Sequence, residues 1–199
     1  MDFTALKERL EQNNFTVTTF STGAEAAAYL NEVIDGKTVG FGSSLTCKEI
    51  GLHQTLPTHN EFYYHSMAAD PREAFAKAAL AQVYICSANA IAVKEGALVN
   101  IDGNGNRVAN TLFNHQKVYI VAGRNKLMPD LEHAIWRARN VAAPKNAQRL
   151  KRKTPCAVHG DRCYDCNSPE RICCGLVIHW RKMYTMDMEI VLIDEDLGL

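Results

Sequence analysis

Short apolar runs rich in β-branched residues alternate with helix-patterned segments along the first two thirds of this 199-residue chain. This alternation constrains the fold most, because strands separated by helices pair in parallel and bury both faces of their sheet. The predicted strands are residues 15–20, 37–42, 61–66, 83–87 and 117–123. The predicted helices are residues 3–10, 22–34, 44–50, 70–81 and 129–142. We therefore expect one α/β domain over residues 1–199, with a mostly parallel sheet and helices on both of its faces.

Local signals set several of the expected helix boundaries. Thr22 and Glu25 have the spacing of a capping box, and Asp70 followed by Pro71 is a strong helix start. Pro144 should stop the last of the predicted helices, because proline has no amide hydrogen to donate.

Four further apolar runs are short enough to be strands. They are residues 90–93, 97–101, 175–180 and 188–193. The run Asp102-Gly-Asn-Gly-Asn106 contains the residues that tight turns require, so we expect a hairpin there, leading into Arg107–Asn110.

The charge balance argues against a partner that is attracted by the net charge of the whole chain. Lys plus Arg equals Asp plus Glu at 22 each, so neither nucleic acid nor an anionic membrane is an expected partner. We interpret a local basic cluster as a helix end or linker: Lys145, Arg149, Lys151, Arg152 and Lys153. No apolar segment approaches the roughly 18–20 residues that a membrane helix requires, and the charged N-terminus does not resemble a signal peptide. We expect a cytoplasmic protein whose thiols stay reduced.

Residues 144–174 differ in composition and are expected to form a Cys-rich insertion or lobe. Cys163 and Cys166 form a CxxC pair, which lets one turn aim both sulfurs at a shared point, while Cys156 and Cys173 lie outside it at similar spacings. Four thiolates suit tetrahedral Zn²⁺ or an iron–sulfur cluster, and the residue types do not separate the two. A disulfide pair and unligated thiols are the alternatives.

The remaining cysteines and one histidine receive simpler interpretations. His159 could replace one thiolate on zinc, and Cys174 is expected to be a small buried hydrophobe. Cys47 and Cys86 lie inside apolar patterns and are predicted to be core thiols.

A glycine-serine loop follows the strand predicted over residues 37–42. Its residues Gly40, Gly42, Ser43 and Ser44 would let a ligand approach the backbone closely at the start of a helix. A tight turn without a ligand is the alternative. The loop is neither the GxGxxG fingerprint nor a P-loop, so no nucleotide cofactor is predicted.

Together with that loop, three stretches and the cysteine pattern resemble the LUD family, named for lactate utilisation. The stretches are Ser87–Ala92, Gly96–Val108 and Val121–Lys126, and the resemblance extends over about residues 5–193. It implies a fold similar to those of ribose-5-phosphate isomerase, glucosamine-6-phosphate deaminase and the coenzyme A transferases. In those relatives the early glycine loop receives phosphate, carboxylate or coenzyme A.

The candidate site residues follow from this resemblance and from the rule that ligands bind at the carboxyl ends of parallel strands. The predicted ligand-binding residues are Gly40, Gly42, Ser43, Ser44, Asn89, Gly96, Arg107, Gly123, Asn125 and Lys126. Arg107 and Lys126 would hold an anionic substrate. Glu95 is a weak catalytic candidate through its likeness to the glutamate–glycine element of coenzyme A transferases, and an exposed turn carboxylate is the simpler alternative.

Three functions remain open, and the sequence does not decide whether the chain is an enzyme. The first is binding of, or action on, a short organic acid or phosphorylated metabolite linked to lactate and pyruvate metabolism. The second is electron transfer or assembly with iron–sulfur partner subunits of lactate oxidation, using a four-cysteine iron–sulfur site. The third is metabolite sensing by a regulatory protein. The sequence also leaves the oligomeric state open, and a homo-oligomer is one of the alternatives.

Overall fold

The computed structural model describes residues 3–199, which form ten strands in two sheets. The larger sheet has six strands in the order β1-β10-β7-β4-β2-β3, and every neighbouring pair in it is parallel. Its strands are β1 (Thr16–Phe20), β2 (Thr38–Phe41), β3 (Glu61–Tyr63), β4 (Val83–Cys86), β7 (Lys117–Gly123) and β10 (Asp187–Ile193). The predicted parallel sheet is therefore confirmed.

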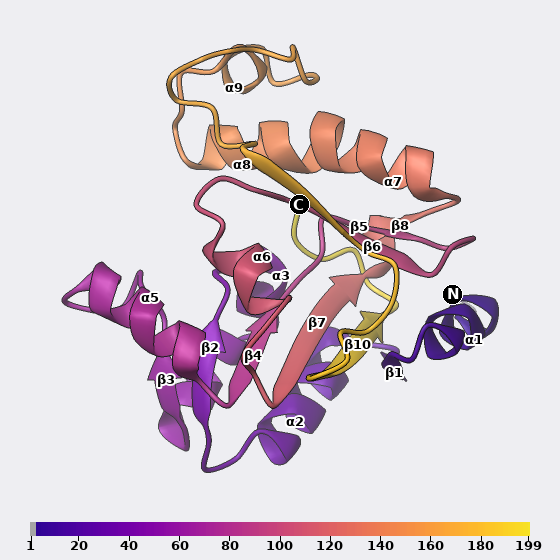
Figure 1. Cartoon of the computed structure of the whole chain (residues 1–199), viewed down its shortest axis with the longest axis vertical. Helices are drawn as coiled ribbons and strands as arrows, with labels where there is room; N and C mark the ends of the chain where they lie inside the picture. Colours follow the sequence, from indigo (N-terminus) through magenta and orange to yellow (C-terminus); the bar gives the residue numbers. More distant parts are fainter. Residues whose placement is uncertain (1–2) are drawn as a thin grey trace.

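Helices cover one face of the parallel sheet (Figure 1). They are α2 (Gly23–Val33), α3 (Leu45–Glu49), α4 (Leu52–Thr55) and the short η1 (Leu56–Thr58). Leu30, Cys47 and Leu52 from these helices pack with Val39 and Ile85 of the sheet in one buried cluster. The predicted capping box at the start of α2 is present, since Thr22 and Glu25 each accept a backbone N–H of the other.

The opposite face is covered by two helices and by the second sheet. The helices are α1 (Thr4–Gln12), at one edge of the molecule, and α5 (Pro71–Leu80), beside β2 and β3 (Figure 1). Leu10 of α1 and Leu98 of the second sheet belong to one cluster with Ile120 and Ile190 of the parallel sheet. Sequence patterns predicted helices on both faces and did not predict a sheet in this place.

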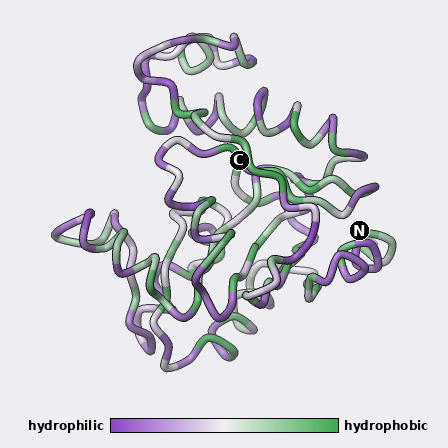
Figure 2. Tube along the Cα trace, in the orientation of Figure 1, coloured by the Kyte–Doolittle hydropathy of each residue, from purple (hydrophilic) through white to green (hydrophobic). Residues whose placement is uncertain are grey.

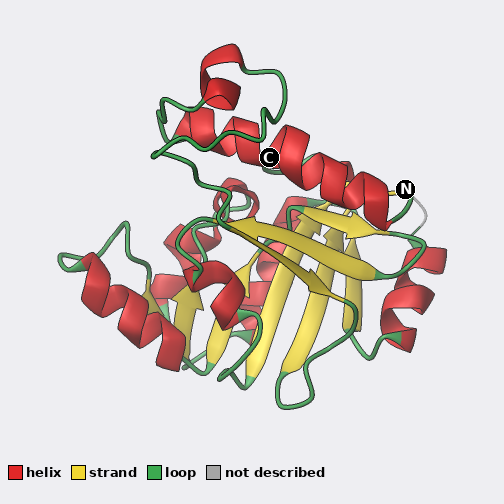
Figure 3. Cartoon of the chain, turned by 45° about the horizontal axis from the view of Figure 1, so that its top comes forward, coloured by secondary structure: helices red, strands yellow, loops and turns green. Residues whose placement is uncertain are grey.

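The second sheet has four strands in the order β8-β5-β6-β9, and its strands cross those of the parallel sheet (Figure 3). They are β5 (Ala90–Ala92), β6 (Ala97–Asp102), β8 (Leu127–Met128) and β9 (Gly175–His179). Its outer face packs on a continuous helical layer through Ala134 and Ala138. That layer consists of α7 (Leu131–Arg137), the π-helix η3 (Ala138–Ala142) and α8 (Ala143–Arg149).

The predicted hairpin at Asp102–Asn106 is wrong. The hairpin connects β5 to β6 instead, and residues after Asp102 turn into the helix α6 (Asn106–Asn110). The Asp102 carboxylate explains this, because Oδ1 accepts the Gly105 amide and Oδ2 accepts the Val108 amide. An Asp that satisfies backbone amides three and six residues ahead starts a helix where we expected a returning strand.

The predicted stop before Pro144 is also wrong, because the helix continues through it into α8. A proline inside an α-helix clashes with the carbonyl four residues earlier. The π-helix η3 ends just before this proline, and its wider turn relieves the clash at the cost of one inserted residue.

Residues 151–174 form a lobe beyond α8 that has almost no regular structure. Its helix α9 (Pro155–His159) is five residues long, and Thr154 is the lobe's one buried residue. The loops of the lobe have mostly hydrophilic colours in Figure 2. Within the described residues, none of the helices is long and apolar enough to cross a membrane.

Gly40 faces a neighbouring helix. A Cβ atom on Gly40 would lie 2.8 Å from the Ala78 carbonyl oxygen of α5 and 2.8 Å from Tyr84 Cδ2. The glycine therefore permits close packing of α5 on β2, a role that its position in the sequence did not reveal.

We expect Gly40→Ala to lower the free energy of unfolding by about 1–3 kcal/mol, because the added methyl group meets backbone that cannot move freely. Gly175→Ala is the matched control, since nothing lies within 4 Å of a Cβ atom there. Urea unfolding of both variants measures the difference, and equal midpoints would contradict the close-packing role.

Candidate functional site

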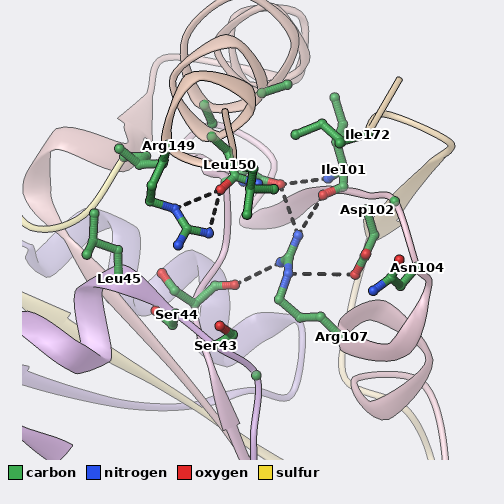
Figure 4. Close-up of a pocket in the computed structure, with 18 of the residues that line it drawn as sticks. Ser43, Ser44, Leu45, Ile101, Asp102, Asn104, Arg107, Arg149, Leu150 and Ile172 are labelled. Atoms are coloured by element: carbon green, nitrogen blue, oxygen red, sulfur yellow. Dashed lines mark hydrogen bonds and ion pairs between the residues drawn. The ribbon is translucent and has the colours of Figure 1, made fainter. Parts of the chain in front are cut away.

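A cavity of about 300 Å³ lies at the carboxyl ends of three parallel strands. Its walls include the loops after β2 and β4, Lys126 at the end of the 3₁₀ turn η2 (Arg124–Lys126) that follows β7, and parts of α6 and α8. Figure 4 shows Ser43 and Ser44 on one wall, with Arg149 above them and Arg107 beside them. The chain leaves β2 toward the helical face and β4 toward the second sheet, so the cavity lies where connections diverge, as expected for α/β sheets.

Six of the ten predicted ligand-binding residues line this cavity. They are Gly42, Ser43, Ser44, Asn89, Arg107 and Lys126. Ser43 has a φ of 54°, in the left-handed region that residues with a side chain rarely adopt. Ser44 starts α3, where its hydroxyl accepts the Cys47 amide. The structure thus brings the early glycine-serine loop and the later basic loop together.

The other four, and Glu95, lie outside the cavity walls. Gly40 packs against α5, as described above. Glu95 and Gly96 form the β5–β6 turn at the opposite end of β6, where the Asn13 side chain donates to both of their carbonyl oxygens. The β5–β6 turn needs Gly96 for its φ of 62°.

Gly123 and Asn125 hold the segment that follows β10. A Cβ atom on Gly123 would lie 2.5 Å from the Glu195 carbonyl oxygen, and Asn125 Oδ1 accepts the Leu197 amide at 3.2 Å. This segment continues to Leu199, which lines the cavity.

The guanidinium of Arg107 ties the strand ends around the cavity together. Its Nη1 donates to the Ser87 carbonyl oxygen and to Asn100 Oδ1, and its Nη2 donates to the Ile101 carbonyl oxygen and to Asn89 Oδ1. Most of its donors are therefore directed at the protein, so Arg107 positions the loops while it adds positive charge.

Lys126 is the most buried cation of the cavity wall, with 4% of its surface exposed. Its Nζ donates to Thr46 Oγ1 at 2.7 Å and to Ser87 Oγ at 2.8 Å. Burial, together with the charges of Arg137 and Arg107, lowers the pKa of Lys126 to about 7, while Cys47 and Glu49 act in the opposite direction. A sizeable fraction of the amine is therefore neutral near pH 7, whereas an ordinary lysine is almost fully charged.

Sequence reasoning missed several residues of the site. Arg149 and Arg152 belong to the basic cluster interpreted as a helix end, and they line the opening of the cavity because α8 continues past Pro144. Thr46 and Ser87 each follow a strand that leads to the cavity, and this position was the one signal that could have identified them.

Positive charge predominates around the cavity. Its wall contains three arginines, Arg107, Arg149 and Arg152, and the partly charged Lys126, against one acidic side chain, Asp102. The Asp102 carboxylate is already engaged by two backbone amides and lies 3.8 Å from Arg107 Nε. The electrostatics therefore favour an anionic ligand.

The four cysteines of the predicted metal set, Cys156, Cys163, Cys166 and Cys173, are half-buried and free of disulfides, but their sulfurs do not converge. Among residues 3–199, no group of three His, Cys, Asp or Glu side chains is placed to hold a metal ion. Arg171 Nε donates to Cys173 Sγ at 3.2 Å, and Arg139 Nη2 contacts Cys163 Sγ at 3.8 Å. Thiols of this kind suit a metal ion, but in this structure the cysteine sulfurs of the lobe do not form a ligand set.

Two other cysteine predictions have clear outcomes. Cys47 and Cys86 are buried core thiols as predicted, and burial raises the pKa of Cys47 to about 11 and that of Cys86 to about 12. Cys174 is exposed, so its predicted burial is wrong, because the lobe has no core to receive it. His159 is exposed as well and packs on the Tyr164 ring.

The family model of the LUD domain matches residues 4–193. The chain belongs to the LUD family. Its structure is similar to a crystal structure of a DUF162 family protein from Deinococcus radiodurans, with a TM-score of 0.56 and 8% sequence identity over 96% of this chain and 95% of that one. At that identity the likeness to the Deinococcus protein concerns the fold alone. No curated protein matches the sequence. The family resemblance that the sequence indicated is confirmed, while the likeness to sugar-phosphate isomerases and coenzyme A transferases stays a prediction.

The lowered pKa of Lys126 predicts how stability depends on pH. Below about pH 7 the amine is charged in both the folded and the unfolded state, and burying the charge opposes folding. Between about pH 7 and the ordinary lysine value the unfolded state binds more protons, so the free energy of unfolding rises with pH. Relative to Lys126→Met, the wild type should gain up to about 1.4 kcal/mol per pH unit in this window.

Urea unfolding of both proteins between pH 6 and pH 10 measures this difference, and groups common to both cancel. Parallel pH profiles for the two proteins would contradict a buried neutral amine.

Proposed function

We propose that the LUD chain binds a small organic acid or a phosphorylated metabolite in the cavity at the ends of β2, β4 and β7. The observation that carries this proposal is the excess of cations over carboxylates in a cavity of about 300 Å³. That volume lies at the small end of the range of about 300–1,000 Å³ for ligand pockets. A metabolite of a few carbon atoms with one carboxylate or phosphate suits both the size and the charge.

The metabolic setting belongs to the same proposal. The resemblance that led to the LUD family implies lactate and pyruvate metabolism, with iron–sulfur subunits of lactate oxidation as partners. Lactate and pyruvate are short, singly charged acids, so both agree with the size and sign of the cavity.

Neutralising the opening tests the proposed anion binding. Arg149 and Arg152 are exposed at the opening, so Arg149→Gln with Arg152→Gln should leave the fold intact. We expect the Kd of a bound anion to rise roughly threefold to tenfold per charge removed, because each arginine contributes a partly solvated charge-assisted contact. Thermal shifts with lactate, pyruvate, inorganic phosphate and ribose 5-phosphate provide the measurement.

Arg181→Gln is the matched control, since Arg181 is exposed and lies outside the cavity wall. The proposal fails if no anion stabilises the wild type, or if the double variant binds as tightly as the control.

For the cysteine lobe we also propose metal binding as a second function. Its support is the absence of a core: within residues 151–174, Thr154 alone is buried, and segments of this size usually need a metal or disulfides to hold one conformation. Cys156, Cys163, Cys166 and Cys173 supply thiols, the donors that Zn²⁺ and iron–sulfur clusters share. A metal ion bound by these four thiols would have to draw their sulfurs together, because they do not converge in this structure.

Two adjacent cysteines offer a matched pair of variants. We expect protein purified without oxygen to contain about one zinc, or one iron–sulfur cluster, per chain, and Cys173→Ser to lose most of it. Cys174→Ser should keep the metal, since Cys174 lies outside the proposed set. Elemental analysis decides between zinc and iron, and metal-free wild-type protein would refute the second function.

A further inference from the structure

The hydrogen bonds around Lys126 fill two of the three hydrogen-bonding directions at its Nζ atom and leave the third unused. Thr46 Oγ1 donates its own hydrogen to the Leu197 carbonyl oxygen, and Ser87 Oγ donates to the Ala88 carbonyl oxygen, each at 3.3 Å. Both hydroxyls can therefore only accept from Nζ. Two N–H groups of Lys126 are satisfied in this way, and within residues 3–199 these hydroxyls are its hydrogen-bond partners.

A third N–H, which only the charged form carries, would have no acceptor among the protein groups of residues 3–199. The charged groups facing the amine also oppose protonation, since Arg137 and Arg107 approach it from α7 and α6. Glu49, the carboxylate of α3 on this side, accepts the Gly198 amide at 2.6 Å. The neighbouring Cys47 is a buried thiol of raised pKa and stays uncharged at neutral pH. The neutral amine, with its lone pair in the unused position, therefore fits the site better than the ammonium.

A buried neutral amine in the wall of a cavity is a nucleophile toward carbonyl carbon. From this geometry we propose that Lys126 forms an imine with a small anionic carbonyl compound bound in the cavity. The proposal rests on the anion binding proposed above and narrows the ligand class, since a carboxylate or phosphate alone does not react with an amine.

The step balances without a further reactant. The Nζ lone pair attacks the carbonyl carbon, a C–N bond forms, and the carbonyl oxygen leaves as water with the two hydrogens of the amine. No electrons are gained or lost. Thr46 and Ser87 accept the two N–H groups of the amine, so they orient the lone pair of Nζ toward the bound carbonyl carbon.

Two ligand sources share the required chemistry. A 2-oxo acid carries its carboxylate next to the carbonyl, and an open-chain sugar phosphate carries its anion several atoms away. In both, the cations of the cavity wall would hold the anionic group while the carbonyl carbon faces Lys126.

Reductive trapping tests the inference. The full chain is incubated at pH 7 with sodium cyanoborohydride and either pyruvate or ribose 5-phosphate, then digested and analysed by mass spectrometry. With pyruvate, a trapped lysine gains the mass of pyruvic acid less one oxygen atom. We expect at least about tenfold more label on Lys126 than on any exposed lysine, because ordinary lysines are almost fully protonated at this pH. Whichever probe labels Lys126 identifies the source.

Two variants and one competitor complete the experiment. Lys126→Met should abolish the dominant label, while Lys94→Met, which alters an exposed lysine outside the cavity wall, should retain it. Inorganic phosphate, an anion without a carbonyl group, should protect Lys126 of the wild type, so the inference stays testable if Lys126→Met does not fold.

Failure of the inference is distinguishable from failure of the proposed function. Phosphate or lactate binding in thermal shifts, combined with label spread evenly over exposed lysines, would overturn the imine while leaving anion binding in place. If no anion raises the unfolding temperature, both the proposed anion binding and the imine are contradicted.

Discussion

Buried positive charge at the carboxyl ends of the parallel strands is the constraint on which the rest of this structure depends. Arg137 and Lys126 are buried, Arg107 is half-buried, and few carboxylates lie near them. An uncompensated buried charge is costly, so each side chain must find partners or lose its proton. Arg137 donates to the backbone oxygens of Asn89, Asn125 and Leu199, and Arg107 donates to the backbone oxygens of Ser87 and Ile101. Of the three, Lys126 alone can lose its charge by releasing a proton near neutral pH.

These contacts make the cavity a junction of segments that are distant in sequence. The arginines bind backbone oxygens of the loop after β4, the end of β6, the turn after β7 and the segment after β10, so removing a ligand does not leave them without partners. A site whose cations are held by backbone groups is already organised before an anion arrives, which lowers the entropy lost on binding.

The sequence predicted what local chemistry determines. The parallel strands followed from β-branched runs, and the starts of α2 and α5 followed from Thr22 and Asp70. The meeting of Ser43 with Lys126 followed from the rule for strand ends. The runs that form β5, β6 and β9 were predicted as strands, but their assembly into a separate sheet was not, because the pairing joins segments remote in sequence and the two-residue β8 has no pattern of its own. The roles of Gly40 and Gly123 depend on backbone atoms of Ala78 and Glu195, which are remote in sequence, so no local pattern could identify them.

The π-helix η3 lets the helical layer contain one extra residue without changing how α8 faces the cavity. A π turn contains one residue more than the matching α turn, so it absorbs the rotation of roughly 100° that an added residue would otherwise impose on the helix that follows. Deleting one residue within Ala138–Ala142 would restore regular α-helix and leave Asn146 and Arg149 on the face toward the cavity, while Ala134 of α7 kept its place. Relatives of this protein with a one-residue gap at this position would therefore keep the same charge at the opening of the cavity.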